Sequence, residues 1–178
     1  KLGKDVKGLD VKNNKLFLDD GEEVNYDNLL IATGSSPVKP PIPGSDGQNV
    51  HSFWTLPQAR AVTSKIKMNT RVTMIGAGFI SFTILNALIS RGVDLTVVEV
   101  EKRVLPRMLD EQGANIVNEW LVSKGINVKT ESRVISIDDH ENEKSIKFDD
   151  GTELKTDLVI MATGIKPNIE WLSDSDLI

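Results

Sequence analysis

Short apolar runs separated by polar turns recur along the chain, and the best ordered set of them spans residues 71–99. Residues 72–75 form a short run rich in β-branched residues, which is typical of a strand buried on both faces. An apolar helical stretch then continues to Ile89, with Gly92 as its stop, and residues 95–98 form a second apolar run. This part of the chain is therefore predicted to be a β-α-β unit.

The same pattern predicts elements on both sides of this unit. Alternation and turn residues predict an antiparallel hairpin within residues 8–24, with turns at residues 13–14 and 19–21. We expect further strands at residues 29–31, 126–128, 133–137, 144–148 and 158–161. We expect helices from Thr55 to about residue 67 and from Asp110 to about residue 123. A proline-rich segment that follows residue 36 is predicted to be a linker between domains.

A glycine-rich turn connects the first strand of the central unit to its helix. Its residues spell G-x-G-x-x-S, one residue away from the dinucleotide-binding fingerprint, and are Gly76, Ala77, Gly78, Phe79, Ile80 and Ser81. Gly76 allows a sharp turn, and Gly78 leaves the backbone N–H groups at the helix start open to a pyrophosphate. Ser81 takes the place of the usual third glycine or alanine, and we expect it to alter the packing contact slightly without loss of the site.

Glu99 ends the second strand, 23 residues after Gly76. This spacing is close to that of a carboxylate that binds the adenosine ribose hydroxyls. Because a carboxylate would repel a 2′-phosphate, NAD is favoured over NADP. Lys102 and Arg103 leave an alternative open, since they could grip a phosphate and permit NADP, although a charged surface loop is the commoner case.

An internal repeat relates the two ends of the chain. Asp19-Asp20-Gly21 recurs as Asp149-Asp150-Gly151, and Ala32-Thr33-Gly34 recurs as Ala162-Thr163-Gly164, at a constant offset of 130 residues. Each copy is predicted to be a β-meander followed by a buried strand that ends in a glycine turn. Because the first copy has no glycine fingerprint before it, we expect the chain to begin inside one dinucleotide-binding domain and then to contain most of another.

The composition narrows the possible classes of protein. The chain has 178 residues, 39% hydrophobic and 26% charged, as in ordinary soluble domains. A net charge of −5 without a basic cluster argues against nucleic acid binding. The chain has no cysteine, so it contains no disulfide or thiol chemistry, and its two histidines belong to no metal motif. No run is long enough to span a membrane, and we expect a cytoplasmic protein.

Three motifs in order resemble the pyridine nucleotide-disulfide oxidoreductases, flavoproteins with two dinucleotide-binding domains. They are YDNLLIATGSSPVKPPIPG, VTMIGAGFIS with VVEVEKRVLPRMLD, and DLVIMATGIKPN. The loop sequences most resemble NADH oxidases and related NADH-dependent reductases. The resemblance implies a Rossmann-like, three-layer α/β domain with a central parallel sheet and a β-meander, plus a β-rich remnant of a second, FAD-binding domain. It implies that residues 1–45 are part of the FAD-binding domain and the crossover linker, that residues 46–168 are the NAD-binding domain, and that residues 169–178 return toward the FAD-binding domain.

The resemblance also implies cofactors, roles and partners. NADH would bind to the fingerprint and pass hydride to FAD, which would reduce a small molecule or a small redox protein. The fingerprint residues would bind pyrophosphate, Glu99 the ribose and Val134 the adenine region, Gly164 would approach the nicotinamide, and Thr33 and Gly34 would touch the flavin half. Thr83 stands where many members have a glutamate that helps to hold the nicotinamide amide. We expect the intact protein to be an enzyme and a homo-oligomer. We assign no catalytic residue within this chain.

Two other functions stay open from the sequence. One is a free-standing NAD-binding sensor or interaction domain, which fingerprint residues encoded upstream would eliminate. The other is a simple dehydrogenase with its substrate site in the same domain, but no Tyr-x-x-x-Lys pair or His-Asp arrangement supports it.

Overall fold

The computed structural model describes residues 1–141 and 143–177. The chain forms two compact units: Lys1–Ser36 with Lys166–Ile178, and Pro37–Ile165. Among the described residues, no helix is both long and apolar enough to cross a membrane. Each unit is described separately below.

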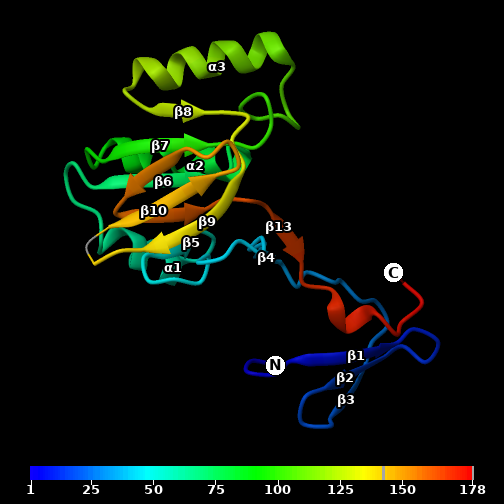
Figure 1. The fold of residues 1–178 in the computed structure, drawn as a ribbon. Coiled ribbons are helices and arrows are strands. Elements are labelled where there is room, and N and C mark those ends of the chain that lie inside the picture. The colour runs from blue at the N-terminus through cyan, green and yellow to red at the C-terminus, as the bar shows by residue number, and fades with distance from the viewer. Residues whose placement is uncertain (142, 178) are drawn as a thin grey trace. The chain divides into compact units, whose positions relative to one another are not determined.

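The larger unit, Pro37–Ile165, is built on a five-stranded parallel sheet (Figure 1). Its strands lie in the order β5 (Val50–Ser52), β12 (Leu158–Met161), β6 (Arg71–Ile75), β7 (Asp94–Val98) and β8 (Asn127–Lys129). The central strand, β6, and its neighbour β7 are the two strands of the predicted β-α-β unit, and they are joined by α2 (Phe79–Ile89). The carboxyl ends of β6, β7 and β12 therefore lie next to one another at one edge of the sheet.

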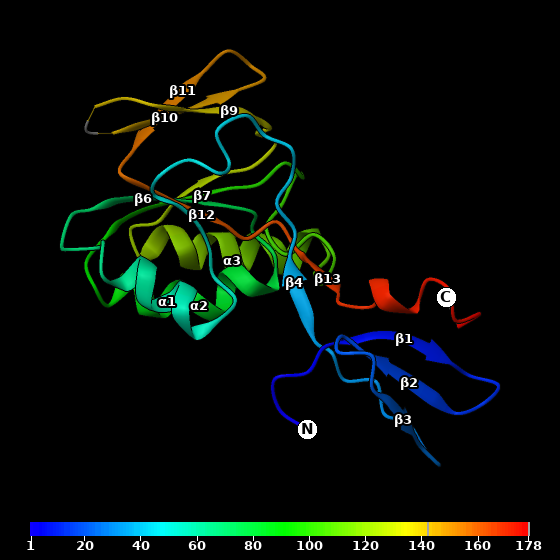
Figure 2. The ribbon, with the colours of Figure 1, turned by 90° about the horizontal axis from the view of Figure 1, so that it is seen from below.

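Three layers form this unit, as the view in Figure 2 shows. The helices α1 (Leu56–Thr63), α2 and α3 (Glu111–Ser123) cover one face of the parallel sheet, and an antiparallel sheet covers the other. That sheet has the order β11 (Glu153–Thr156), β10 (Lys144–Phe148), β9 (Val134–Asp139).

β12 is apolar throughout because both of its faces are buried. In β12, Leu158 and Ile160 belong to the core beneath the helices, whereas Val159 and Met161 belong to the core shared with β9 and β10. Neighbouring β6 has one buried polar residue, Thr73, among its buried apolar residues. Successive side chains of a strand point to opposite faces, so a strand between two layers buries side chains on both faces. This explains why the sequence of β12 is an unbroken apolar run.

The smaller unit contains a second antiparallel meander. Its strands β1 (Val6–Asp10), β2 (Lys15–Leu18) and β3 (Glu23–Asn25) lie in that order, and the short 3-10 helix η1 (Glu170–Leu172) packs against β1. Leu9, Leu18 and Leu172 are buried in it. The remaining strands, β4 (Ser35–Pro37) and β13 (Ile165–Pro167), pair with each other.

The two copies of the predicted repeat have the same local structure as far as their second turn. Gly21 and Gly151 adopt φ of +84° and +82°. In both copies the glycine N–H donates to the residue three positions earlier, with N···O distances of 3.1 Å to Leu18 and 3.1 Å to Phe148. Both turns connect the second and third strands of a meander, which confirms the predicted duplication of this unit.

The copies then differ, and one predicted strand is wrong. Residues 158–161 form β12 as predicted, but residues 29–31 form no strand and Leu30 is 88% exposed. β12 lies hydrogen-bonded between β5 and β6, whereas no described strand pairs with residues 29–31. An apolar run forms a buried parallel strand only where neighbouring strands satisfy its backbone groups.

The other predicted elements are present, with small changes at their ends. Asp110 caps α3 by accepting a hydrogen bond of 2.8 Å from the N–H of Gly113. α1 begins after Thr55 as predicted but ends at Thr63, where the chain turns: the N–H of Lys65 donates to Val62 O at 3.0 Å, and the N–H of Lys67 donates to Thr70 Oγ1 at 2.8 Å. The hairpin within residues 133–148 has a third strand, β11.

The proline-rich segment belongs to the larger unit. The N–H of Ile137 in β9 donates to the carbonyl oxygen of Pro43 at 2.9 Å. Gly44 has φ +85°, and a Cβ there would lie 1.8 Å from the oxygen of Ile137. The close backbone contact explains the glycine and holds this segment against β9.

Candidate functional site

The glycine turn after β6 folds tightly against the end of β12. Gly76 has φ +103°, and a Cβ at this position would lie 2.4 Å from the carbonyl oxygen of Ala162. Its N–H donates to the oxygen of Val98, at the end of β7, at 2.7 Å. Only glycine combines this backbone conformation with this approach, so Gly76 joins the carboxyl ends of three strands.

Gly78 is required for a different reason. Its φ of −87° and ψ of −173° are accessible to any residue, and a Cβ there would meet no atom within 4 Å. Gly78 is the N-cap of α2, and no side chain caps this helix, in contrast to the cap that Asp110 provides for α3. The first N–H groups of a helix carry a partial positive charge and need acceptors. The start of α2 is therefore open to an anion.

Glu99 is fixed by the same turn. Its carboxylate accepts hydrogen bonds from the N–H of Ala77 at 2.7 Å and from the N–H of Glu101 at 3.0 Å. The residue is 7% exposed and borders a cavity. Each carboxylate oxygen has a second lone pair, so the group can still accept bonds from ligand hydroxyls.

Ser81 fits the third fingerprint position better than expected. It is fully buried, and its hydroxyl donates to the carbonyl oxygen of Gly76 at 2.5 Å. Serine thus satisfies a backbone acceptor of the turn. The contact between helix and strand gains a hydrogen bond that glycine or alanine could not make.

A loop from Val100 to Leu109 borders the turn. The N–H of Leu105 donates to the carbonyl oxygen of Ala77 at 2.8 Å. The guanidinium of Arg103 donates to the oxygens of Leu109 at 3.1 Å and Pro106 at 3.3 Å. Arg103 therefore stabilises the loop from within, and the alternative in which it grips a cofactor phosphate is not supported.

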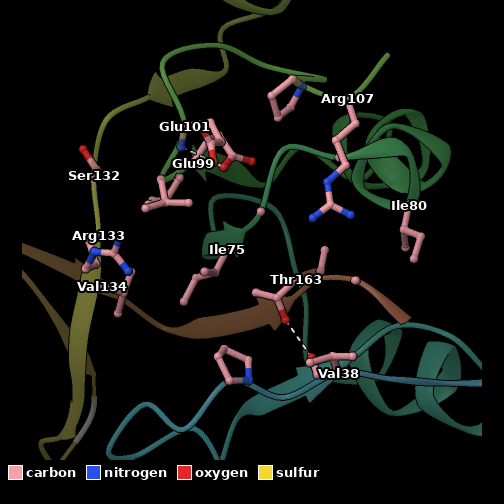
Figure 3. A pocket seen from close by; sticks show the side chains of 18 of the residues that line it. Val38, Ile75, Ile80, Glu99, Glu101, Arg107, Ser132, Arg133, Val134 and Thr163 are labelled. Atoms are coloured by element: carbon pink, nitrogen blue, oxygen red, sulfur yellow. Dashed lines mark hydrogen bonds between the residues drawn. The ribbon is translucent and has the colours of Figure 1, made fainter. Parts of the chain in front are cut away.

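These groups surround one cavity of about 1030 Å³, shown in Figure 3. Its walls come from the ends of β6, β7 and β12, the start of α2, the loop after β7 and the proline-rich segment. The volume matches the upper range of small-molecule and cofactor sites. It lies at the carboxyl edge of a parallel sheet, where open α/β folds bind their ligands.

The cavity brings together most of the predicted site residues. Those that line it are Gly76, Gly78, Phe79, Ile80, Glu99, Val134 and Gly164. Ala77 and Ser81 are buried beneath the turn and do not line it. Thr33 and Gly34 belong to the smaller unit, where Asn168 bonds to both: its N–H donates to Gly34 O at 3.0 Å, and its side-chain amide donates to Thr33 O at 3.0 Å.

Other lining residues were not predicted. Pro40, Pro41 and Ile42 line the cavity although their segment was predicted to be only a linker. Nothing in the sequence beyond the prolines indicated this role, because the residues that form a cavity wall depend on which distant segments pack opposite them. Arg107 and Arg133 also line the cavity, and single charged residues in loops gave no reason to select them.

The family model described as pyridine nucleotide-disulphide oxidoreductase matches residues 1–178. The chain is 39% identical over 171 residues to an NADH oxidase of Methanocaldococcus jannaschii, covering 93% of this chain and 38% of the relative. It is 33% identical over 168 residues to the assimilatory nitrate reductase electron transfer subunit of Bacillus subtilis, covering 94% of this chain and 22% of that protein.

Solved structures agree with these relatives. The water-forming NADH oxidase from Lactobacillus brevis bound to NADH matches with a TM-score of 0.84 and 27% identity, over 96% of this chain and 39% of that one. The chain thus spans less than half the length of each of these three proteins. The family match over the whole chain, together with the glycine turn and the parallel sheet, shows that the chain belongs to the pyridine nucleotide-disulphide oxidoreductase family.

Proposed function

We propose that the unit Pro37–Ile165 is the NAD(H)-binding domain of an NADH-dependent flavoprotein oxidoreductase. The observation that carries this proposal is the open start of α2: Gly78 caps the helix without a side chain, and the space beside it belongs to the cavity. Because the helix start combines unpaired N–H groups with the positive end of the helix dipole, it suits a pyrophosphate.

The cavity also fits the rest of a dinucleotide. Glu99 would accept hydrogen bonds from the adenosine ribose hydroxyls, and Val134 would contact the adenine region. Gly164, with φ +119° and no atom within 4 Å of a Cβ, would leave room at the nicotinamide end. When bound, the two cofactors supply the redox chemistry, the transfer of a hydride from NADH to FAD. The described residues would bind and orient the cofactors, and we assign no chemical step to any of them.

The proposal extends to the smaller unit and to the whole protein. Thr33 and Gly34, held by Asn168, would belong to the FAD-binding part. The relatives' names point to an acceptor that receives electrons from NADH, since they include an NADH oxidase and an electron transfer subunit. We therefore propose a small molecule or a small redox protein as the final acceptor.

The test is a calorimetric titration of the chain with NADH and NADPH, with circular dichroism to confirm folding. We expect NADH to bind more tightly than NADPH, because the carboxylate of Glu99 disfavours a 2′-phosphate. A matched variant is Gly78→Val, whose Cβ would lie more than 4 Å from the atoms of every residue other than its chain neighbours and whose methyl groups occupy the space at the start of α2. It should remain folded and lose NADH binding. A folded wild-type chain that binds neither nucleotide would refute the proposal.

A further inference from the structure

Two arginines that line the cavity, Arg107 and Arg133, have no role in the proposed function, and Arg107 is the one on the side of α2. Figure 3 shows its side chain directed into the cavity from the loop after β7, on the side of Ile80. Among the residues that the structure describes, its guanidinium forms no hydrogen bond or ion pair, although Glu99 and Glu101 line the same cavity. An exposed arginine in a cavity that contains two carboxylates, and paired with neither, is available to a ligand.

The backbone around Arg107 is held in place. Arg103 bonds to the oxygens of Pro106 and Leu109, on either side of Arg107. Leu105 bonds to Ala77, the middle residue of the G-A-G turn, and has φ +50°. The arginine is therefore carried by a loop that is attached to the glycine turn itself. No described residue bonds to its guanidinium, but its backbone is fixed beside the start of α2, the proposed anion site.

The charges divide the cavity into two parts. In Figure 3, Glu99 and Glu101 lie together and Arg133 lies beside Val134, whereas Arg107 lies apart from all three, toward the start of α2. The carboxylates can accept hydrogen bonds from the two hydroxyls of a ribose. The helix start, with a guanidinium opposite it, can donate hydrogen bonds to a diphosphate. Arginine matches phosphate oxygens with parallel N–H groups, which makes it suited to a diphosphate.

We propose that Arg107 binds the diphosphate of the dinucleotide from the side opposite the glycine turn, so that it increases affinity for NADH and NADPH equally. This inference rests on the proposed function, because it assigns a residue within the same site. It differs from a role in selecting NADP, which would require the arginine to contact the 2′-phosphate.

The experiment compares the wild-type chain with Arg107→Gln by calorimetry, using NADH, NADPH and ADP-ribose, which has the diphosphate but no nicotinamide. Arg107 is exposed and unpaired among the described residues, so the variant should fold, which circular dichroism checks. We expect all three dissociation constants to rise by the same factor, about tenfold for one charge-assisted contact. Arg107→Lys should recover part of the loss.

The matched control is Lys102→Gln, which removes one positive charge from the same loop. Lys102 is exposed and does not line the 1030 Å³ cavity, so the three dissociation constants should not change. Equal losses in Lys102→Gln and Arg107→Gln would reveal a general charge effect and overturn the inference.

Other outcomes identify where the inference fails. A loss confined to NADPH would place Arg107 at the 2′-phosphate, and a loss that spares ADP-ribose would place it at the nicotinamide end. No loss in any titration would show that Arg107 does not contact the ligand. Each of these results overturns the inference but leaves the proposed function intact, whereas a folded wild-type chain without NADH binding overturns both.

Discussion

The backbone N–H of Ala77 donates a hydrogen bond of 2.7 Å to the buried carboxylate of Glu99, which joins the glycine turn after β6 to the end of β7. The carboxylate thus has a structural role in addition to the ligand contact proposed for it. A substitution of Glu99 is therefore expected to affect both stability and affinity, and the two effects can be measured separately.

Replacing Glu99 with glutamine removes one of the two acceptors for the N–H groups of Ala77 and Glu101. We expect the free energy of unfolding to fall by about 1–3 kcal/mol, the cost of an unsatisfied buried donor. The preference for NADH over NADPH should also shrink, because the negative charge is lost. Denaturant unfolding and calorimetry measure the two effects. Glu119→Gln is the control, because Glu119 is exposed on α3 and does not line the cavity, and an equal shift in that variant would contradict the assignment.

The two glycines of the turn are expected to lose different amounts of stability when replaced by alanine. Gly76→Ala places a Cβ 2.4 Å from Ala162 O at φ +103°, so the variant should lose about 2 kcal/mol or more of stability. Gly78→Ala meets no atom and should lose less than about 1 kcal/mol, the cost of a poorer N-cap. Thermal unfolding measures both, and similar losses would contradict the structural difference.

Ser81→Ala is expected to reduce stability while NADH affinity is preserved. The variant loses the hydroxyl that bonds to Gly76 O, at a cost of about 1 kcal/mol. Since Ser81 does not line the cavity, the dissociation constant for NADH should stay within about twofold. A large loss of affinity without a loss of stability would show that Ser81 contacts the ligand.

The acid stability of the larger unit should depend on Asp157. Hydrogen bonds from the Arg71 guanidinium hold the pKa of this carboxyl below its usual value of 3.8. A carboxyl with a lowered folded-state pKa contributes stability above pH 3.8, and this contribution is lost as the pH falls from there through the folded-state pKa. Asp157→Asn should therefore unfold more readily at neutral pH and lose less of its remaining stability on acidification. Thermal unfolding at pH 7 and near pH 3 tests this, and parallel pH dependence in both proteins would refute it.

Hydrogen exchange is expected to be faster in the first meander than in the central sheet. The smaller unit has few buried apolar residues, and its strand β2 lies in a sheet of only three strands. By contrast, β6 lies between β12 and β7 and contributes side chains to the hydrophobic cores on both faces of the parallel sheet. Local opening needs less free energy where fewer apolar contacts are lost. Equal protection of residues 15–31 and 72–75 would contradict this prediction.

The sequence by itself determined the elements that depend on local pattern. The strands at β6, β7 and β12, the helix after the glycine turn, the cap at Asp110 and the two Asp-Asp-Gly turns were predicted correctly, because periodicity, capping and glycine conformations act over a few residues. The candidate residues of the glycine turn and Glu99 followed from spacing alone. In the structure, Gly76, Gly78 and Glu99 line one cavity.

Only the tertiary structure decided the rest. Residues 29–31 and 158–161 are both apolar runs before Ala-Thr-Gly, but only the second run has strands on both sides and becomes a strand. Likewise, Arg103 and Arg107 are neighbouring arginines in one loop; the first bonds to its own backbone and the second extends into the cavity. Local pattern cannot distinguish such pairs, because strand neighbours and cavity walls are formed by residues distant in the sequence.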